Sequence, residues 1–325
     1  MKRCFLHLGL HKTGTSAIQR SLFANKSYLK QKGIYYGQTA GFEAHHNIAV
    51  LVPKAAEDTD FHAAERRLVD GFQAINDAAQ DDDIIISSEM FLERNVGLVL
   101  NAANNVFPCL EVIIYLRRQD LLIESVYNQM VKQNGVHEAV NQGEYYFIDF
   151  LARLNEIARF VPLDRLHTRV YEREKLINGD LIDDFFAIIK PSLNIGELVS
   201  PSRVNESLNL MAIEVFRHAN KIGVTSLAPM ADLVNTVVAD LYPDRSQSMI
   251  GCYLAPKRRV ALLDEVRAAN ADILANYCGA RWSTLFSPPE EILESKRADI
   301  SGADFGRIMA HVTARLYKIG SEVKG

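Results

Sequence analysis

The 325-residue sequence is short of cysteine, of long apolar runs and of excess basic charge. Its four cysteines, Cys4, Cys109, Cys252 and Cys278, are scattered and form no CxxC pair, which argues against a disulfide framework or a zinc site. No stretch approaches the roughly 18 consecutive apolar residues of a membrane-spanning helix. The formal net charge of −4 provides no sequence-wide basic surface for nucleic acid, so any anion site must be built locally.

The N-terminus does not have the pattern of a secretion signal. The apolar run behind Met1-Lys2-Arg3 is short, and it ends at His11-Lys12. Hydrophobic residues make up 48% of the chain and charged residues 23%, as is typical of soluble globular proteins. We therefore expect a cytoplasmic protein without a membrane segment and without a nucleic-acid partner.

Short apolar runs alternate with amphipathic helical patterns over the first 200 residues. The predicted strands are 3–8, 34–36, 84–87, 112–116 and 166–171. The predicted helices between and after them are 15–31, 62–79, 119–133 and 147–160. Strand runs that are continuously apolar indicate burial on both faces. The sequence therefore predicts the α/β class, with a central parallel sheet of about five strands flanked by helices.

After about residue 200 the strand patterns stop. Helical spacing of apolar residues continues over 206–222, 257–278 and 303–318. Neither a repeat nor a low-complexity linker separates this part from the rest. We therefore predict one domain over 1–325, with an α/β core at about 1–200 and a helical part at about 201–325.

The most informative stretch is the loop 9–16, Gly-Leu-His-Lys-Thr-Gly-Thr-Ser, between the first strand and the first helix. Such a loop brings backbone N–H groups and the positive end of a helix together, and both bind phosphate-like anions. The usual nucleotide-binding P-loop, GxxxxGK[ST], places its lysine after the second glycine. Here Lys12 comes two residues before Gly14, so the pattern of kinases and ATPases is not met.

A second anchor for an anion follows the fourth strand, which runs into Arg117. Ligands of open α/β sheets bind outside the carboxyl ends of the strands, and a guanidinium group can bind phosphate there with two parallel hydrogen bonds. Ser125, eight residues later in the next helix, can add a hydroxyl to the same anion. The alternative is an arginine that forms a surface ion pair.

These motifs together resemble the PAPS-dependent sulfotransferase family, and especially its bacterial branch. The loop from His11 to Ser16 is similar to the 5′-phosphosulfate loop, and Arg117 with Ser125 is similar to the 3′-phosphate motif. Tyr171 matches a strand-end tyrosine that helps to hold the adenine end. The resemblance implies that PAPS (3′-phosphoadenosine 5′-phosphosulfate) is the co-substrate, that no metal is required and that the α/β core binds the nucleotide. The implied nucleotide-binding residues are His11, Lys12, Thr13, Gly14, Thr15, Ser16, Arg117, Ser125 and Tyr171.

Sulfuryl transfer needs a cation at the leaving oxygen and a base at the acceptor. Lys12 suits the first role. Glu89, just past the third strand, is the preferred base, because other branches of the family use a glutamate where cytosolic members have a histidine. His46, which follows the second strand with its neighbour His45, is the other candidate. The structural alternatives are a glutamate at a helix N-terminus and surface or helix-capping histidines.

The acceptor is expected to be a hydroxyl or amine of a small molecule or carbohydrate, such as a saccharide or a lipid-linked glycan. Tyr145-Tyr146-Phe147 and Tyr242-Pro243 could line a sugar-binding cleft, although aromatic residues are more often packing residues. A phosphotransferase that uses ATP, with Glu89 or Asp120 holding Mg²⁺, is the alternative enzyme. A non-catalytic nucleotide-binding protein of the same fold is the third hypothesis.

Overall fold

The computed structural model describes residues 2–37, 40–52, 60–140, 149–200, 208–224, 227–243, 253–288 and 300–322. The chain divides into two compact units. The first, here called the α/β unit, consists of Met1–Arg118, Asp149–Ser202 and Val266–Pro288, and the second, the helical unit, consists of Gln119–Ile148, Arg203–Glu265 and Pro289–Gly325. The single domain predicted for 1–325 stays a prediction.

The α/β unit is built on a five-stranded parallel sheet of order β2-β3-β1-β4-β5. The strands are β1 (Cys4–Leu8), β2 (Ile34–Tyr35), β3 (Asp83–Ser88), β4 (Leu110–Leu116) and β5 (Leu166–Val170). Leu6 of β1 is paired with Ile86 on one side and Val112 on the other, and all three are fully buried. This arrangement confirms the predicted parallel sheet and places the end of β1 between the ends of β3 and β4.

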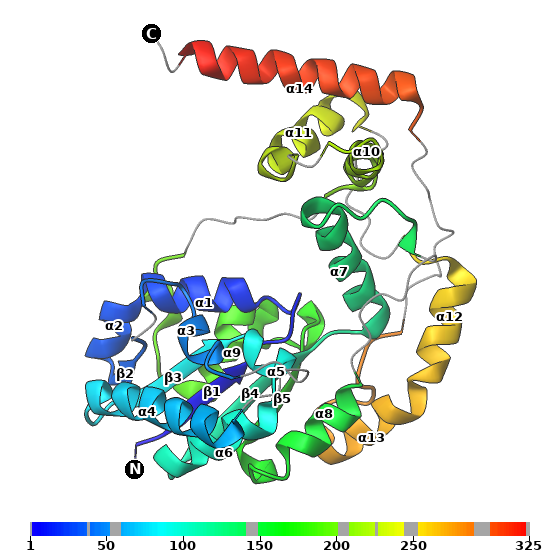
Figure 1. Ribbon diagram of the computed structural model, residues 1–325. Coiled ribbons are helices and arrows are strands. Elements are labelled where there is room, and N and C mark those ends of the chain that lie inside the picture. The colour runs from blue at the N-terminus through cyan, green and yellow to red at the C-terminus, as the bar shows by residue number, and fades with distance from the viewer. Residues whose placement is uncertain are drawn as a thin grey trace. The chain divides into compact units, whose positions relative to one another are not determined.

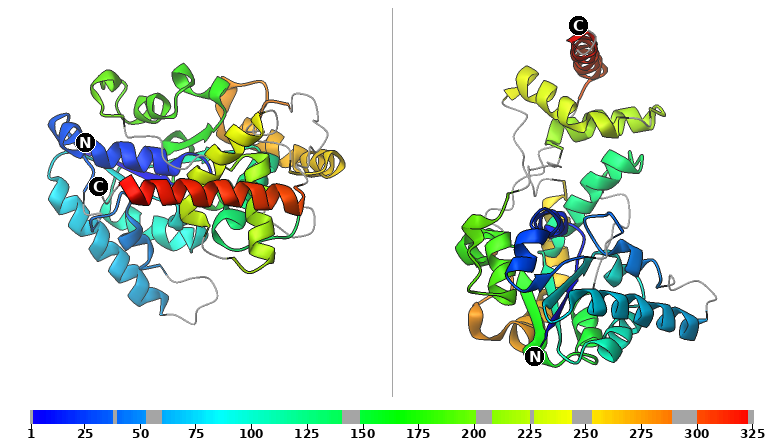
Figure 2. Two further views of the ribbon diagram at one scale, coloured as in Figure 1. Left: turned by 90° about the horizontal axis from the view of Figure 1, so that it is seen from above. Right: turned by 90° about the vertical axis from the view of Figure 1, so that its left-hand side faces the viewer.

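Helices cover both faces of this sheet, with α1 and α9 on one face and α4 and α6 on the other (Figures 1 and 2). Phe5, Ile85 and Phe185 belong to the apolar cluster on the face of α1 and α9. The helices of the unit are α1 (Thr15–Ala24), α2 (Lys26–Gln31), α3 (His46–Ala49), α4 (Phe61–Ala79), α5 (Met90–Glu93), α6 (Val96–Val106), α8 (Phe150–Ile157), α9 (Leu181–Ile189) and α13 (Arg267–Tyr277).

The helix predicted over 15–31 is two helices, because the chain breaks at Asn25. The buried Asn25 amide donates to the carbonyl oxygens of Ser21 and Val199, and its Oδ1 accepts from the Val199 N–H. A buried side chain that forms these bonds satisfies backbone groups at the break. Helix α1 therefore ends at Ala24 and is a short, separate helix that directly follows the loop 9–14.

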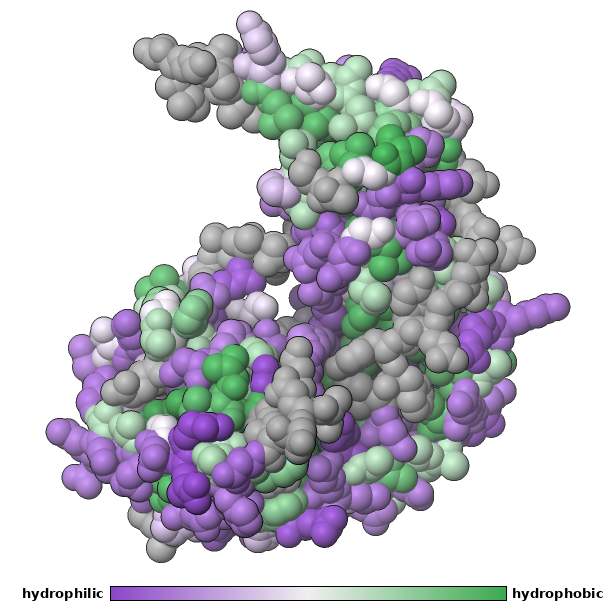
Figure 3. All heavy atoms as spheres, in the orientation of Figure 1, coloured by the Kyte–Doolittle hydropathy of each residue, from purple (hydrophilic) through white to green (hydrophobic). Residues whose placement is uncertain are grey.

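The helical unit contains α7 (Gln119–Gln133), α10 (Leu210–Lys221), α11 (Ala231–Leu241), α12 (Pro256–Glu265) and α14 (Gly302–Glu322). Helix α14 packs along α11 (Figure 2), and hydrophobic residues gather along these two helices (Figure 3). The apolar core of the helical unit includes Met211, Val215, Val234, Val238, Ile308 and Val312. Helix α11 was not predicted, and the helix predicted over 257–278 is divided at Val266 into α12 and α13, which belong to different units.

Across the described ranges, no helix is both long enough and apolar enough to cross a membrane. The predicted aromatic run Tyr145-Tyr146-Phe147 lies outside the described residues. The hydroxyl of Tyr242, the other aromatic candidate, donates to Asp304 Oδ1 at 2.9 Å within the helical unit. The Tyr242 hydroxyl is therefore engaged in packing α11 against α14.

Candidate functional site

The loop 9–14 joins the end of β1 to the start of α1 in a strained conformation. Lys12 has φ +64°, in the left-handed region that residues with a Cβ seldom adopt. The loop is closed by Thr13, which is fully buried and whose hydroxyl donates to the Leu10 carbonyl at 2.7 Å. The Thr13 hydroxyl thus stabilises the turn that presents Lys12.

The N-terminus of α1 has no side-chain cap. Gly14 precedes the helix, and its first turn contains no acidic residue. The first N–H groups of a helix lack intrahelical partners and carry the positive end of the helix dipole. Thr15 is buried beside this end, and Ser16 is exposed. The predicted anion-binding residues of the loop therefore lie together at one helix end.

Arg117 and Tyr171 join the loop from the next two strands. Arg117, which follows β4, donates from Nη1 to the Lys12 carbonyl at 2.7 Å, and its guanidinium carbon lies 5.9 Å from the centre of the Tyr171 ring. A Cβ built on Gly14 would lie 3.0 Å from the same ring. The structure thus brings Lys12, Gly14, Arg117 and Tyr171 together. Arg117 supports the loop backbone and is not simply a surface arginine.

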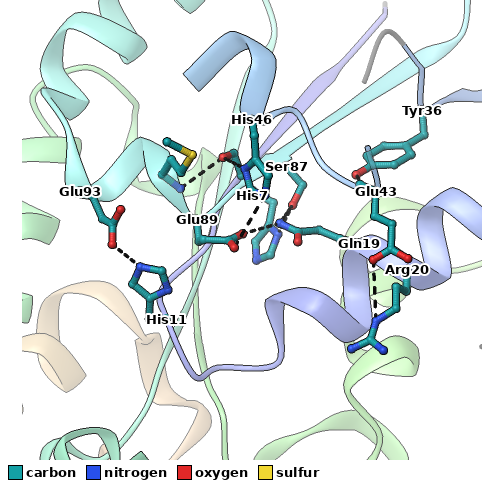
Figure 4. A network of polar contacts seen from close by, with 12 residues as sticks. His7, His11, Gln19, Arg20, Tyr36, Glu43, His46, Ser87, Glu89 and Glu93 are labelled. Carbon is teal, nitrogen blue, oxygen red and sulfur yellow. Dashed lines mark hydrogen bonds and ion pairs between the residues drawn. The ribbon is translucent and has the colours of Figure 1, made fainter. Parts of the chain in front are cut away.

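Glu89 lies at the end of β3, beside the other flank of β1. It precedes the short helix α5, yet its side chain does not cap that helix. Instead its Oε2 accepts from Nε2 of Gln19 at 2.9 Å, and its Oε1 lies 3.8 Å from Nε2 of His46 (Figure 4). The carboxylate is held on two sides while its side chain remains 20% exposed. A group that is both held and accessible can exchange a proton with a bound molecule.

His46 faces Glu89 with a defined ring orientation. Its Nδ1 lies 2.8 Å from the hydroxyl oxygen of Ser88, which also accepts from the Met90 N–H at 3.2 Å. The contact with Ser88 holds the ring with its Nε2 on the side of Glu89. The two candidate bases are therefore neighbours that share one site.

His45 has a different role from its neighbour. It is fully buried, its Nε2 donates to the Gly37 carbonyl at 2.8 Å, and its Nδ1 accepts from the Ser87 N–H at 3.2 Å. Burial lowers the pKa of His45 to about 4, so the ring is neutral near pH 7. His45 attaches the loop after β2 to β3, which is a structural function.

His11 is paired with Glu93 of α5 (Figure 4). The hydrogen bond to Glu93 raises the pKa of His11, and the Glu89 charge contributes in the same direction. The side chain before Lys12 is thereby attached to the element that follows Glu89. The ion pair of His11 with Glu93 therefore connects the loop 9–14 to the α5 side of the candidate site, where Glu89 lies.

Sequence reasoning missed three residues behind Glu89, namely His7, Gln19 and Ser87. The Ser87 hydroxyl oxygen lies 2.8 Å from His7 Nδ1 and 3.2 Å from Gln19 Nε2. All three are buried. The sequence does contain a sign of these residues, namely a polar side chain where an apolar one is expected. Gln19 follows the buried Ile18 in α1, and Ser87 follows an isoleucine run in β3.

The remaining predicted positions lie in the helical unit. Ser125 is on α7, and its contact with a 3′-phosphate stays a prediction. Asp120, a possible Mg²⁺ ligand of a phosphotransferase, is fully buried and forms an ion pair with Arg259. Among the residues that the structure describes, no group of three or more His, Cys, Asp or Glu side chains could hold a metal ion.

Comparisons with known proteins give distant similarities. No family model matches the sequence. An uncharacterized protein of Archaeoglobus fulgidus is 24% identical over 223 residues, which cover 64% of this chain and 57% of that protein, so the match spans little more than half of the relative's length. A solved sulfotransferase domain from the curacin biosynthetic pathway is similar over 59% of this chain and 70% of its own, with a TM-score of 0.30 and 14% identity.

Proposed function

We propose that this protein transfers a sulfuryl group from PAPS to a hydroxyl or amine of a small-molecule or carbohydrate acceptor. One observation carries the proposal. Lys12, which precedes the second glycine of the loop, follows the central strand β1. Arg117 and Tyr171 lie on one side of it, at the ends of β4 and β5. Glu89 lies on the other side, at the end of β3. Donor-binding and proton-accepting groups then occupy opposite flanks of one strand end.

The donor would bind on the side of Arg117. The 5′-phosphate takes the uncapped N-terminus of α1, with the Thr15 and Ser16 region around it. Tyr171 offers its ring to the adenine end. Arg117 binds the 3′-phosphate as a charged donor. His11 stays in contact with Glu93 and supports the loop.

The reaction is an in-line displacement at sulfur. The acceptor oxygen or nitrogen forms the new bond to sulfur while the bond between sulfur and the bridging oxygen of PAPS breaks. The electron pair of the broken bond stays on that oxygen, where Lys12 stabilises the developing negative charge. The acceptor proton passes to Glu89, with His46 beside it.

The test is a thermal-shift comparison of PAP, the desulfated product, with ATP in the presence and absence of Mg²⁺. A ligand that binds only the folded state adds about 2.7 kcal/mol at a hundred times its Kd, so specific binding raises Tm measurably. We expect PAP to stabilise the protein without Mg²⁺, and Arg117→Ala to reduce the shift. Stabilisation by ATP that requires Mg²⁺, with none by PAP, would favour a phosphotransferase and refute the proposal. Labelled PAPS with an acceptor library then identifies the acceptor.

A further inference from the structure

The side chain of Gln19 contacts Glu89 from the helix that begins at the anion-binding loop. Gln19 is 3% exposed, and its Nε2 donates to Glu89 Oε2 at 2.9 Å and to Ser87 Oγ at 3.2 Å (Figure 4). An amide nitrogen has two hydrogens, and both are used here. Helix α1 therefore presents its N-terminus to the proposed donor and a buried amide to the proposed base.

The orientation of the Gln19 amide follows from its partners. An ionised carboxylate is an acceptor only, so Glu89 requires the nitrogen side of the amide. The second hydrogen of that nitrogen then points to Ser87. The Ser87 oxygen accepts it and also lies 2.8 Å from Nδ1 of His7. Gln19 thus links the carboxylate of Glu89 to a buried pair of polar side chains.

His7 makes this end of the chain of hydrogen bonds rigid. It is fully buried on β1, and its ring meets Phe185 edge to face at 5.4 Å between ring centres. Burial lowers the pKa of His7 to about 3, so the ring stays neutral over the physiological pH range. The buried ring and the buried Ser87 hydroxyl hold each other in place beside the Gln19 amide.

We propose that Gln19 is a positioning residue for Glu89. Its amide favours the ionised carboxylate and turns it away from the N-terminus of α5, toward His46 and the exposed side of the site. The catalytic consequence rests on the proposed function, because a base must be ionised before it accepts the acceptor proton. The structural part of the proposal depends only on the contacts of Gln19.

Other titratable groups also face Glu89. His46 of α3 lies 3.8 Å away and shares the site. His11 and Tyr36 also feel the Glu89 charge. That charge is a minor contribution to the raised pKa of His11, after the hydrogen bond to Glu93, and to the raised pKa of Tyr36, after burial. Gln19 differs from these groups because it is uncharged and donates directly to the carboxylate.

The first experiment follows the ¹³C carboxyl signal of Glu89 in the full-length protein as pH is varied, with the signal assigned by Glu89→Gln. Gln19→Leu keeps the side-chain size and removes both donors. This variant should raise the pH at the midpoint of the Glu89 titration by about one unit, because losing one hydrogen bond to a charged group typically costs the corresponding free energy. Gln19→Glu places a second carboxylate against the first and should move the midpoint further.

The matched control is Asn25→Leu, a buried amide at the end of the same helix that forms its bonds elsewhere. It should lower stability and leave the Glu89 midpoint in place. A midpoint that Gln19→Leu leaves unchanged would overturn the proposal. So would an equal shift in the Asn25 variant. Neither readout requires donor or acceptor.

The second experiment measures turnover and PAP binding in the same variants. Gln19→Leu should lower kcat about tenfold near neutral pH, because the carboxylate is no longer held toward the exposed side of the site. The Kd for PAP should stay within about twofold of the parent, and the acid limb of the kcat profile should move upward. A shifted carboxyl midpoint with unchanged kcat would overturn the catalytic part of the proposal. Failure of the parent protein to bind PAP would refute the proposed function, while the carboxyl titration still tests Gln19.

Discussion

Gly14→Ala tests whether the loop 9–14 is packed against its neighbours as the structure shows. Gly14 has φ +80°, and a Cβ built on it would overlap Leu181 Cδ2 and lie 3.0 Å from the Tyr171 ring. The left-handed backbone costs a residue with a Cβ about 1–2 kcal/mol. Overpacking adds about 1–3 kcal/mol, because Leu181 or Tyr171 must move. We therefore expect the free energy of unfolding to fall by about 2–5 kcal/mol.

A control at Gly33 separates the two contributions to that loss. Gly33 has φ +75° in the same unit, and a Cβ there would meet nothing closer than 3.9 Å. Gly33→Ala therefore carries the backbone cost without the overpacking. The double variant Gly14→Ala with Leu181→Ala removes part of the clash, so the two changes should be non-additive.

The assay is urea unfolding followed by the fluorescence of Trp282, the one tryptophan of the chain, which lies in the α/β unit. Gly14→Ala should unfold at a lower urea concentration than Gly33→Ala, and it should also weaken PAP binding, because Tyr171 is displaced. Equal unfolding midpoints for the two variants would show that Gly14 is not in contact with Leu181 and Tyr171, and would refute the packing argument.

Three further predictions concern the candidate site. Lys12→Ala should lose most turnover with PAPS while the unfolding midpoint changes little, and a full rate would refute its role at the leaving oxygen. Glu89→Gln should lower kcat with little change in PAP affinity, and if His46→Ala has that effect while Glu89→Gln does not, the base is His46. The raised pKa of His11 means that its pair with Glu93 stabilises the fold below about pH 6.5 and loses this effect as the pH rises through the raised value. Glu93→Gln should therefore lower Tm at pH 6 and match the parent at pH 9, and an equal loss at both values would contradict the assignment.

The strand pattern was predictable because burial on both faces requires continuous apolar runs, and those runs are visible in the sequence. The structure confirms the five parallel strands. Two of them are longer than predicted, since β3 starts at Asp83 and β4 at Leu110, and the other three are one residue shorter. Helix boundaries were less predictable. The break at Asn25 depends on contacts with distant Val199, and local periodicity does not record such contacts.

The candidate anion-binding loop could be predicted from the sequence, because strand, glycine, lysine and helix are neighbours along the chain and the local backbone forms the turn. The roles of the residues around it were decided by the tertiary structure. Arg117 meets the Lys12 carbonyl, and Glu89 meets Gln19, 70 residues away, because parallel strands bring their carboxyl ends to one edge of the sheet. The adjacent His45 and His46 divide into a buried structural ring and a partner of Glu89 for the same reason. Only the folded chain determines which side chain of a neighbouring pair faces the core.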